Sequence, residues 1–216
     1  MHLPGPWWRC LSLCCCITPG YTQPLPVRDL NPLLSGYELP PALPVMATHT
    51  TLSAALTISN ISLDQRTAQE ALQVDAELKR WQLSFTRPLG KTTGLSIELP
   101  YTSLSGGQLD SFIESFHDTF GLPNGNRDLW PGNRLWIRHA RNGQPGYDLS
   151  DAQHGIGDLT LRLGTQLGTH ADFHNVLWAS VKLPTGDADT LTGSGAVDVA
   201  LTLASSQQLG TRFTSR

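Results

Sequence analysis

Cysteine is absent from most of this chain, and charged residues are few. All four cysteines lie within the first 16 of 216 residues, so the remainder can form no disulfide, thiolate metal site or cysteine nucleophile. Only 15% of residues are charged and the formal net charge is −3, which gives no indication of nucleic-acid binding. No run of about 18 apolar residues occurs, so no transmembrane helix is predicted.

The N-terminus has the pattern of an export signal. Arg9 precedes an apolar stretch at 10–17, which Pro19 and Gly20 then interrupt. We therefore predict a cleaved signal peptide at 1–23; a lipoprotein cysteine at Cys14 fits poorly, because the preceding residue is not small. Residues 24–46 are rich in proline and are predicted to form an extended lead-in, not a packed element.

Six segments alternate apolar and polar residues with a period of two, as half-buried strands do. They are 51–59, 80–86, 94–101, 157–164, 175–183 and 196–204. One apolar and one polar face per strand fits a soluble sandwich, with apolar faces inward. It fits equally a transmembrane barrel, with apolar faces toward lipid and polar faces toward the lumen.

The connections between these segments favour the barrel. They are long after the first, third and fifth segments and short after the second and fourth. Outer-membrane barrels have such an asymmetry, with short periplasmic turns and long extracellular loops. Residues 47–216 are therefore predicted to form the N-terminal part of an antiparallel transmembrane β-barrel, with outer-membrane lipid as its partner.

The polar faces of these strands carry charges of both signs. The candidate lumen-lining residues are Arg80, Glu98, Asp158, Arg162, Lys182 and Asp198. They either line a polar channel or pair with one another across strands, and pairing is the default because a small barrel must fill its interior.

A large insert at 106–155 interrupts the strand pattern. Residues 108–120 have helical periodicity, and 134–150 are predicted to form a hairpin that turns at Asn142-Gly143. An apolar stripe on the helix provides candidate contacts for plugging or capping the barrel, made by Leu109, Phe112, Ile113, Phe116 and Phe120.

Polar residues in the insert raise the question of catalysis or metal binding. Glu114, His117 and Asp118 resemble a metal or acid–base site. The helical Glu-x-x-His pair Glu114 and His117 could bind a metal, but two ligands without a second such pair do not complete a site. We interpret His117 as a residue at the border of the apolar stripe. Asp187 and Asp189 suit either Ca²⁺ or a solvated turn, and the turn is preferred. No catalytic residue, metal or cofactor is predicted, and an enzyme is not expected.

Three blocks of sequence together resemble a known family. They are "PLPVRDLNPLLSGYELP" (24–40), "LPYTSLSGGQLDSFIESFHDTFGLPNGNR" (99–127) and the segment from "GIGDLTLRLGTQL" to "LTGSGAVDVALTL" (155–203). The pattern resembles the domain of unknown function 3187 family, and the last block is similar to outer-membrane proteins of the MetA-pathway phenol-degradation type. The resemblance implies a signal peptide, a Gram-negative outer-membrane location and a barrel. It assigns no catalytic residue.

The chain stops at "LGTRFTSR", just as a seventh strand would start. Single-chain barrels have an even number of at least eight strands, so a truncated product is expected. The preferred function is an outer-membrane pore or transport protein for an unidentified small molecule. The alternatives are a periplasmic β-sandwich binding module and a barrel-embedded hydrolase using Ser111, Ser115, His117 and Asp118.

Overall fold

A computed structural model describes residues 31–34, 39, 46–124, 127, 130–170 and 173–207. These residues form one antiparallel sheet of nine strands and one helix. The predicted signal peptide at 1–23, most of the lead-in and the segment from 208 onward lie outside the described residues.

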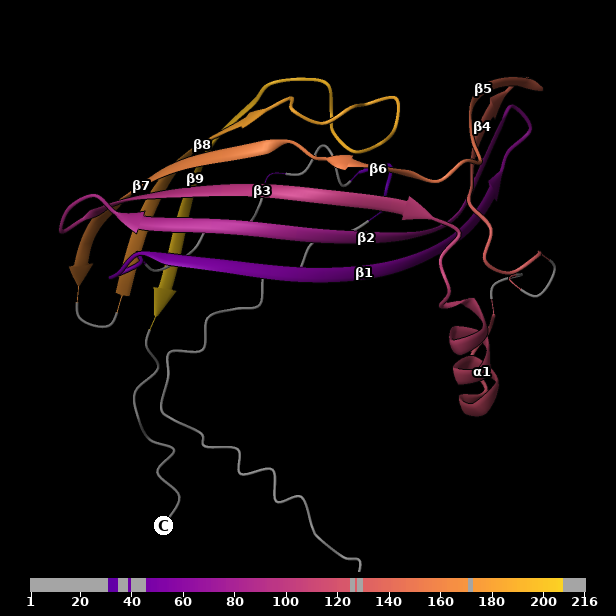
Figure 1. The fold of residues 1–216 in the computed structure, drawn as a ribbon, viewed down its shortest axis with the longest axis horizontal. Helices are drawn as coiled ribbons and strands as arrows, with labels where there is room; N and C mark the ends of the chain where they lie inside the picture. Colours follow the sequence, from indigo (N-terminus) through magenta and orange to yellow (C-terminus); the bar gives the residue numbers. More distant parts are fainter. Residues whose placement is uncertain are drawn as a thin grey trace, which may run out of the picture.

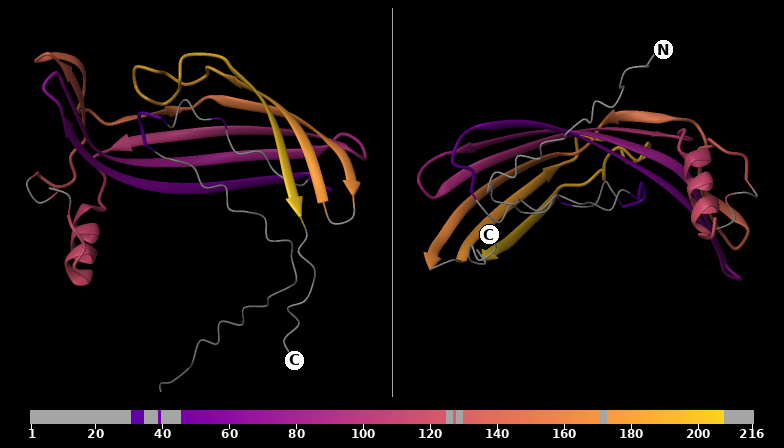
Figure 2. Two further views of the ribbon diagram at one scale, coloured as in Figure 1. Left: turned by 180° about the vertical axis from the view of Figure 1, so that it is seen from behind. Right: turned by 90° about the horizontal axis from the view of Figure 1, so that it is seen from below.

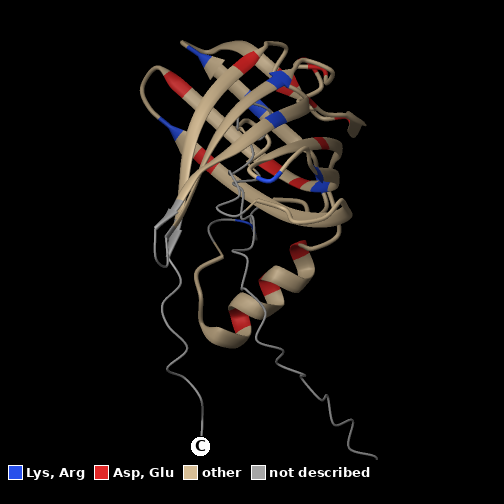
Figure 3. Cartoon of the chain, turned by 90° about the vertical axis from the view of Figure 1, so that its left-hand side faces the viewer, with Lys and Arg blue, Asp and Glu red and all other residues tan. Residues whose placement is uncertain are grey.

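Six long strands form the main wall of the sheet. In spatial order they are β1 (Thr51–Arg66), β2 (Glu70–Pro88), β3 (Thr93–Ser105), β7 (Leu159–His170), β8 (Phe173–Leu183) and β9 (Asp198–Gln207). The wall is strongly curled, so that it encloses part of a barrel and stays open on one side (Figures 1 and 3). The prediction of an all-β antiparallel fold with an incomplete barrel of six full strands is confirmed.

The insert adds one helix and three short strands at one end of this wall. They are α1 (Asp110–Phe120), β4 (Trp136–Arg141), β5 (Gln144–Leu149) and β6 (Gln153–Ile156). The β4–β5 hairpin turns at Asn142 and Gly143, whose φ angles of 50° and 75° suit an Asn-Gly turn. β4 pairs with the start of β2, and β6 pairs with the end of β3, so the insert extends the wall. We call this end the rim.

All nine strands of the described chain belong to a single sheet. A sandwich needs two sheets packed face to face, so the soluble-sandwich alternative is wrong for this part of the chain.

β1 and β2 are much longer than predicted. Residues 60–71, expected as a long loop, continue both strands to a tight turn in which the Thr67 amide donates to the Glu70 carbonyl oxygen at 2.7 Å. The first connection is therefore short, and the predicted alternation of long and short connections is corrected at this point. The alternation of apolar residues persists here but changes phase, as described below, and that change concealed the continuing strand.

The sheet has a concave and a convex face. Directly paired residues on neighbouring strands point to the same face, so the strand register shows which residues share each face. At the rim, the concave face holds a buried apolar core of Val74, Ala76, Leu78, Leu104, Leu135 and Ile137. Leu33 of the lead-in packs against this core. Part of the lead-in is thus packed, contrary to expectation, because its apolar side chain covers the core where solvent would otherwise reach it.

Close packing across β7 and β8 gives a first prediction. A Cβ at Gly164 would lie 2.7 Å from ring carbons of Trp178, its register partner. Gly164→Ala should therefore lower the free energy of unfolding by about 1–3 kcal/mol through overpacking. The urea midpoint of the folded protein in detergent measures this, and Gly90→Ala is the control, since nothing lies within 4 Å of its added Cβ. Equal midpoints for the two variants would contradict the packing argument.

Candidate functional site

The six charged residues predicted to line a lumen all lie on the concave side of the sheet. Register places Glu98 opposite Thr160, Thr160 opposite Lys182, and Lys182 opposite Asp198, in one row across four strands. Arg162 lies in the next row, and Asp158 directly precedes β7. Arg80 lies further along β2, opposite Thr102 of β3.

Five of these charged residues, Glu98, Asp158, Arg162, Lys182 and Asp198, pair with one another. The Arg162 guanidinium lies 2.5 Å from Glu98 Oε1. Lys182 Nζ lies 2.6 Å from Asp198 Oδ2 and 3.6 Å from Asp158 Oδ2. The side chains of Arg162 and Lys182 are only 2% exposed, and buried charges require such partners. The structure thus agrees with the pairing interpretation. The pairs of Arg162 with Glu98 and of Lys182 with Asp158 are largely screened from solvent, whereas the Asp198 side chain is 39% exposed.

Asp158 has a second role at the base of the connection between β8 and β9. Its Oδ1 accepts the Gly186 amide at 3.0 Å, and its Oδ2 accepts the Ser194 amide and hydroxyl, each at 2.8 Å. A carboxylate that accepts several N–H and O–H donors forms a strong, directional anchor. Sequence reasoning placed Asp158 among the lumen charges but missed this function.

The segment 184–197, which we call the strap, lies beside β6 (Figure 1). Its Thr192 lies on the concave side, because a Cβ at Gly155, the register partner of Thr102, would be 3.5 Å from it. Leu191 packs against the apolar core of β2, β3 and β4, and the Asp189 carbonyl oxygen accepts the Tyr147 hydroxyl of β5 at 3.1 Å. Thr192 and Ser194 are buried. The strap therefore reaches from β8 to the β4–β5 hairpin. Residues 192–194 are buried, whereas Asp187 and Asp189 are exposed in a turn, as the preferred prediction had it.

The convex face is apolar and exposed. Register brings the outward side chains of all six wall strands into one continuous band, in which Val199 and Leu201 are each 75% exposed. Exposed members include Leu52, Leu56, Ile58, Trp81, Leu83, Leu99, Tyr101, Leu163, Val199, Leu201 and Leu203. An exposed apolar surface that runs over six strands exceeds the isolated patches of soluble monomers.

The band ends where the alternation changes phase. In β2 the apolar residues occupy odd positions from Trp81 to Phe85 and even positions from Leu72 to Leu78. In β1 the same change falls between Ile58 and Ile61, and these sites are neighbours in the register. Beyond it, apolar side chains turn to the concave core and polar ones to the outside. The signal was readable in the sequence as a break in period two.

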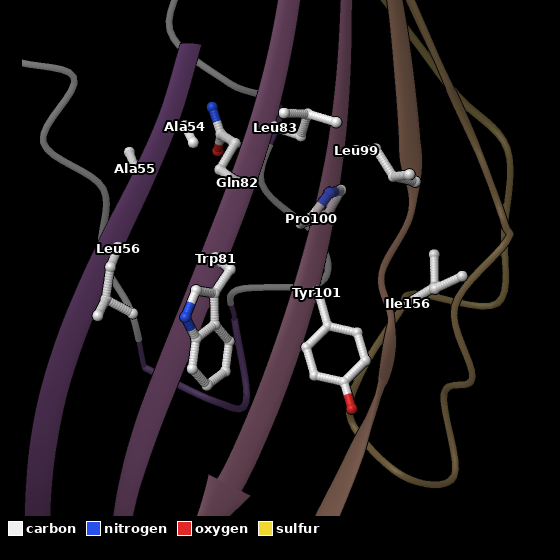
Figure 4. A pocket seen from close by; sticks show the side chains of 10 residues that line it. All are labelled: Ala54, Ala55, Leu56, Trp81, Gln82, Leu83, Leu99, Pro100, Tyr101 and Ile156. Atoms are coloured by element: carbon white, nitrogen blue, oxygen red, sulfur yellow. The ribbon is translucent and has the colours of Figure 1, made fainter.

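A shallow apolar groove of about 550 Å³ lies in the band near this boundary (Figure 4). Trp81 and Tyr101 border it with ring centroids 5.8 Å apart. Leu56, Leu83, Leu99 and Ile156 contribute further large apolar side chains to its lining.

A polar cluster on the convex side of the rim attaches α1 to the wall. Glu77 Oε2 accepts the amides of Gln108 and Leu109, at 3.1 Å and 3.2 Å. Asp110 accepts the Asn60 amide group at 2.9 Å and the Asn133 backbone amide at 2.6 Å. These contacts fasten the beginning of α1 to the outer side of the wall.

The apolar stripe of α1 does not dock on the strands, which corrects the predicted plug. Phe112, Phe116 and Phe120 are 67%, 46% and 65% exposed, and Leu109 and Ile113 are half-buried. The helix projects away from the sheet in Figure 1 and in the left-hand view of Figure 2. The physical reason is its attachment: the polar contacts of Glu77 and Asp110 hold its N-terminus outside the wall, where it cannot enter the concave side.

The residues considered for catalysis are engaged in local contacts. His117 Nδ1 lies 3.1 Å from the Pro123 carbonyl oxygen, and Asp118 accepts the Asn124 side-chain amide at 3.0 Å. Both contacts stabilise the exit of the helix at Gly121, whose φ is 66°. Among the described residues, no cluster of three or more metal-ligating side chains is found, and no helix has the length and apolar character to span a bilayer.

The rim also contains a perturbed carboxyl group. Burial raises the pKa of Asp75, and the neighbouring carboxyl of Asp110 raises it further, whereas Arg134 and Arg127 oppose the shift. Arg134 Nη2 lies 3.6 Å from Asp75 Oδ2, and its guanidinium stacks 3.7 Å from the centroid of Trp136. Ionisation of Asp75 therefore lowers the stability of the folded state.

This cost predicts a pH dependence. A folded-state pKa above the ordinary value of 3.8 means that the folded state binds more protons, so stability falls as pH rises from 3.8 through the raised pKa. Asp75→Asn should reduce this fall, because its side chain stays neutral. Urea midpoints of the two proteins across that range measure the effect. Asp151→Asn, at an exposed site, is the control; a decline unchanged in Asp75→Asn would refute the assignment.

Comparison with known proteins identifies the family of the chain. Residues 19–215 match the family described as Protein of unknown function (DUF3187), and this match extends over nearly the whole chain. Neither a curated protein nor a solved structure gives a significant match. The resemblance to the domain of unknown function 3187 family is thereby confirmed, and the chain belongs to that family; the similarity to MetA-pathway proteins stays a prediction.

Proposed function

We propose that this protein forms the wall of a β-barrel in the bacterial outer membrane, and that its polar interior is a pore for small hydrophilic solutes. One observation carries the proposal: the curled sheet exposes apolar side chains on its convex face and buries paired charges on its concave face. A soluble protein arranges these faces in the opposite way.

The convex face supports residence in lipid. Leaving residues such as Leu201 and Leu203 in water forgoes about 1.5–3 kcal/mol for each side chain, which burial in hydrocarbon would recover. From Leu95 to Tyr101 the band extends about 20 Å along β3, at about 3.3 Å per residue. Outer-membrane barrels carry an apolar band about 25 Å tall, so one strand crosses most of it.

The change of phase supports the same placement. On the side of the apolar band, Trp81 and Tyr101 face outward together, and aromatic residues typically mark the interface of a membrane barrel. On the side of the rim, the outward positions of β2 are Lys79, Glu77 and Asp75, which suit an aqueous phase. The rim would then extend beyond the lipid, with its own apolar core turned inward.

The concave face supports a water-filled or narrowly packed interior. Its strands carry Ser, Thr, Gln and paired charges, such as Gln82, Thr160 and Ser180. Pairing Arg162 with Glu98 and Lys182 with Asp198 neutralises the wall without an apolar filling. A neutral polar wall suits passage of hydrophilic solutes.

Membrane residence requires every strand edge to be hydrogen-bonded. In the described chain the outer edges of β1 and β9 have no strand partner. All neighbouring wall strands are antiparallel, so β1 and β9 run in opposite directions, as the ends of an even-numbered barrel segment should. The proposal therefore includes pairing of these two edges with further strands in the membrane.

A matched pair of arginine substitutions tests the membrane location. Leu201 lies outward near the middle of the band in β9, and Thr202 points to the concave side. Leu201→Arg should destabilise the membrane-inserted protein by about 2–4 kcal/mol, since it places a charge in hydrocarbon. Thr202→Arg should cost much less. Urea titration in lipid vesicles measures both.

Two further outcomes bear on the proposal. If alkaline carbonate without detergent extracts the wild-type protein from membranes, the proposed outer-membrane location is wrong. Protein that stays in the membrane but gives no flux of small sugars or ions across vesicles would leave the location standing and overturn the pore.

A further inference from the structure

The strap lies on the concave side at the rim, where a lumen would open. We propose that the strap (184–197) is the constriction of this lumen, which limits the size of the passing solute, and that Asp158 is the positioning residue that holds it there. The inference rests on the proposed pore and assigns its selectivity to one segment.

The strap reaches across the opening and does not lie along one strand. It leaves the wall after Leu183 and returns at Asp198, on the adjoining strands β8 and β9. Between these points Leu191 reaches the core of β2, β3 and β4, and the Asp189 carbonyl oxygen meets the Tyr147 hydroxyl. A segment with both ends on one side of the wall and its middle on another narrows the space between them.

The base of the strap is closely packed. A Cβ at Gly186 would lie 2.7 Å from Gly193 Cα, and a Cβ at Gly193 would lie 2.4 Å from Asp158 Oδ1. Thr185 Oγ1 donates to the Gly157 carbonyl oxygen at 2.7 Å and accepts the Leu159 amide at 2.9 Å. The two ends of the strap are thus clamped together around the Asp158 carboxylate.

Internal hydrogen bonds give the strap a defined shape. The Thr192 and Gly193 amides donate to the Asp187 carbonyl oxygen at 3.0 Å and 3.1 Å, and the Asp189 amide donates to Asp187 Oδ1 at 2.9 Å. A constriction needs such rigidity, because a freely moving loop would not set a sharp size limit.

The strap presents negative charge to a solute. Asp187 and Asp189 are exposed, and the sequence from 184 to 197 contains no Lys, Arg or His. The carboxylate of Asp158, in contrast, is only 4% exposed and lies beside Lys182. The proposed constriction therefore favours small neutral and cationic hydrophilic solutes over anions.

Release of the strap is the direct test of the anchor. The native cysteines are replaced by serine, and Thr192→Cys introduces a thiol at a buried strap position, 5% exposed. Asp158→Asn removes the charged acceptor of the Gly186 and Ser194 donors, so reaction of this thiol with a maleimide should accelerate about tenfold or more. Ser194→Ala, which removes one donor, should give a smaller increase.

The control for charge is Asp198→Asn. Asp198 is the other carboxylate beside Lys182, whereas the strap donors Gly186 and Ser194 bond to Asp158, so loss of the Asp198 charge should leave the labelling rate within about twofold of the parent. Ala188→Cys places a thiol at an exposed strap position. Its labelling rate shows whether the reactivity of the maleimide itself differs between the variants.

Channel recordings in planar bilayers, with the full chain lacking the added cysteine, test the constriction. Asp158→Asn should raise single-channel conductance about twofold and admit larger sugars, because the strap no longer narrows the mouth. The double variant Asp187→Asn/Asp189→Asn should reduce cation preference without raising the size limit.

The outcomes separate the two ideas. Faster labelling with unchanged conductance and size limit would overturn the constriction while leaving the pore. Unchanged labelling in both Asp158→Asn and Ser194→Ala would overturn Asp158 as the anchor. A wild-type protein without channels would overturn the proposed pore and, with it, the constriction; the labelling rates would still decide whether Asp158 holds the strap.

Discussion

The curvature of one antiparallel sheet, combined with the phase of its apolar residues, determines everything else in this structure. Because side chains alternate between the faces of a strand, each strand can present its apolar residues to only one side. Here all six wall strands present them to the convex side, where register joins them into a band. Charged residues must then lie on the concave side, and burial there forces them to pair, as Arg162 does with Glu98 and Lys182 with Asp198.

The same constraint explains the rim. When the phase changes near Lys79 in β2, the strand continues without a break, but its apolar residues begin to face the concave side. They meet Leu104, Ile137 and Leu33 there and form a conventional buried core. The outward side chains become polar, and Glu77 and Asp110 use this surface to attach α1 outside the wall. One strand thus has an apolar outer surface along one part of its length and a polar outer surface along the next.

The insert helix and the strap each pack differently from what their sequences suggest. The helix has the amphipathic pattern of a docking element, yet its phenylalanines remain exposed and its polar residues make the attachment. The strap reads as a polar, glycine-rich turn, yet it packs through Leu191 and is anchored by a buried carboxylate. Membership of the DUF3187 family assigns no chemistry to either segment. The contacts of the strap, in contrast, place it across the opening that the proposed pore would use.

The sequence alone determined the strand character, the antiparallel all-β class, the helix and hairpin of the insert and the common face of the six charged residues predicted to line a lumen. These follow from local periodicity and from turn residues such as Asn142 and Gly143. The length of β1 and β2 was also present in the sequence, but only as an inverted phase between Ile58 and Ile61. The tertiary structure decided which side of the wall α1 occupies, that Asp158 clamps the strap, and that the Asp75 carboxyl is costly to ionise. Each of these depends on groups far apart in the chain, such as Asp158 and Ser194 or Asp75 and Asp110, and no local period of the sequence encodes their distance.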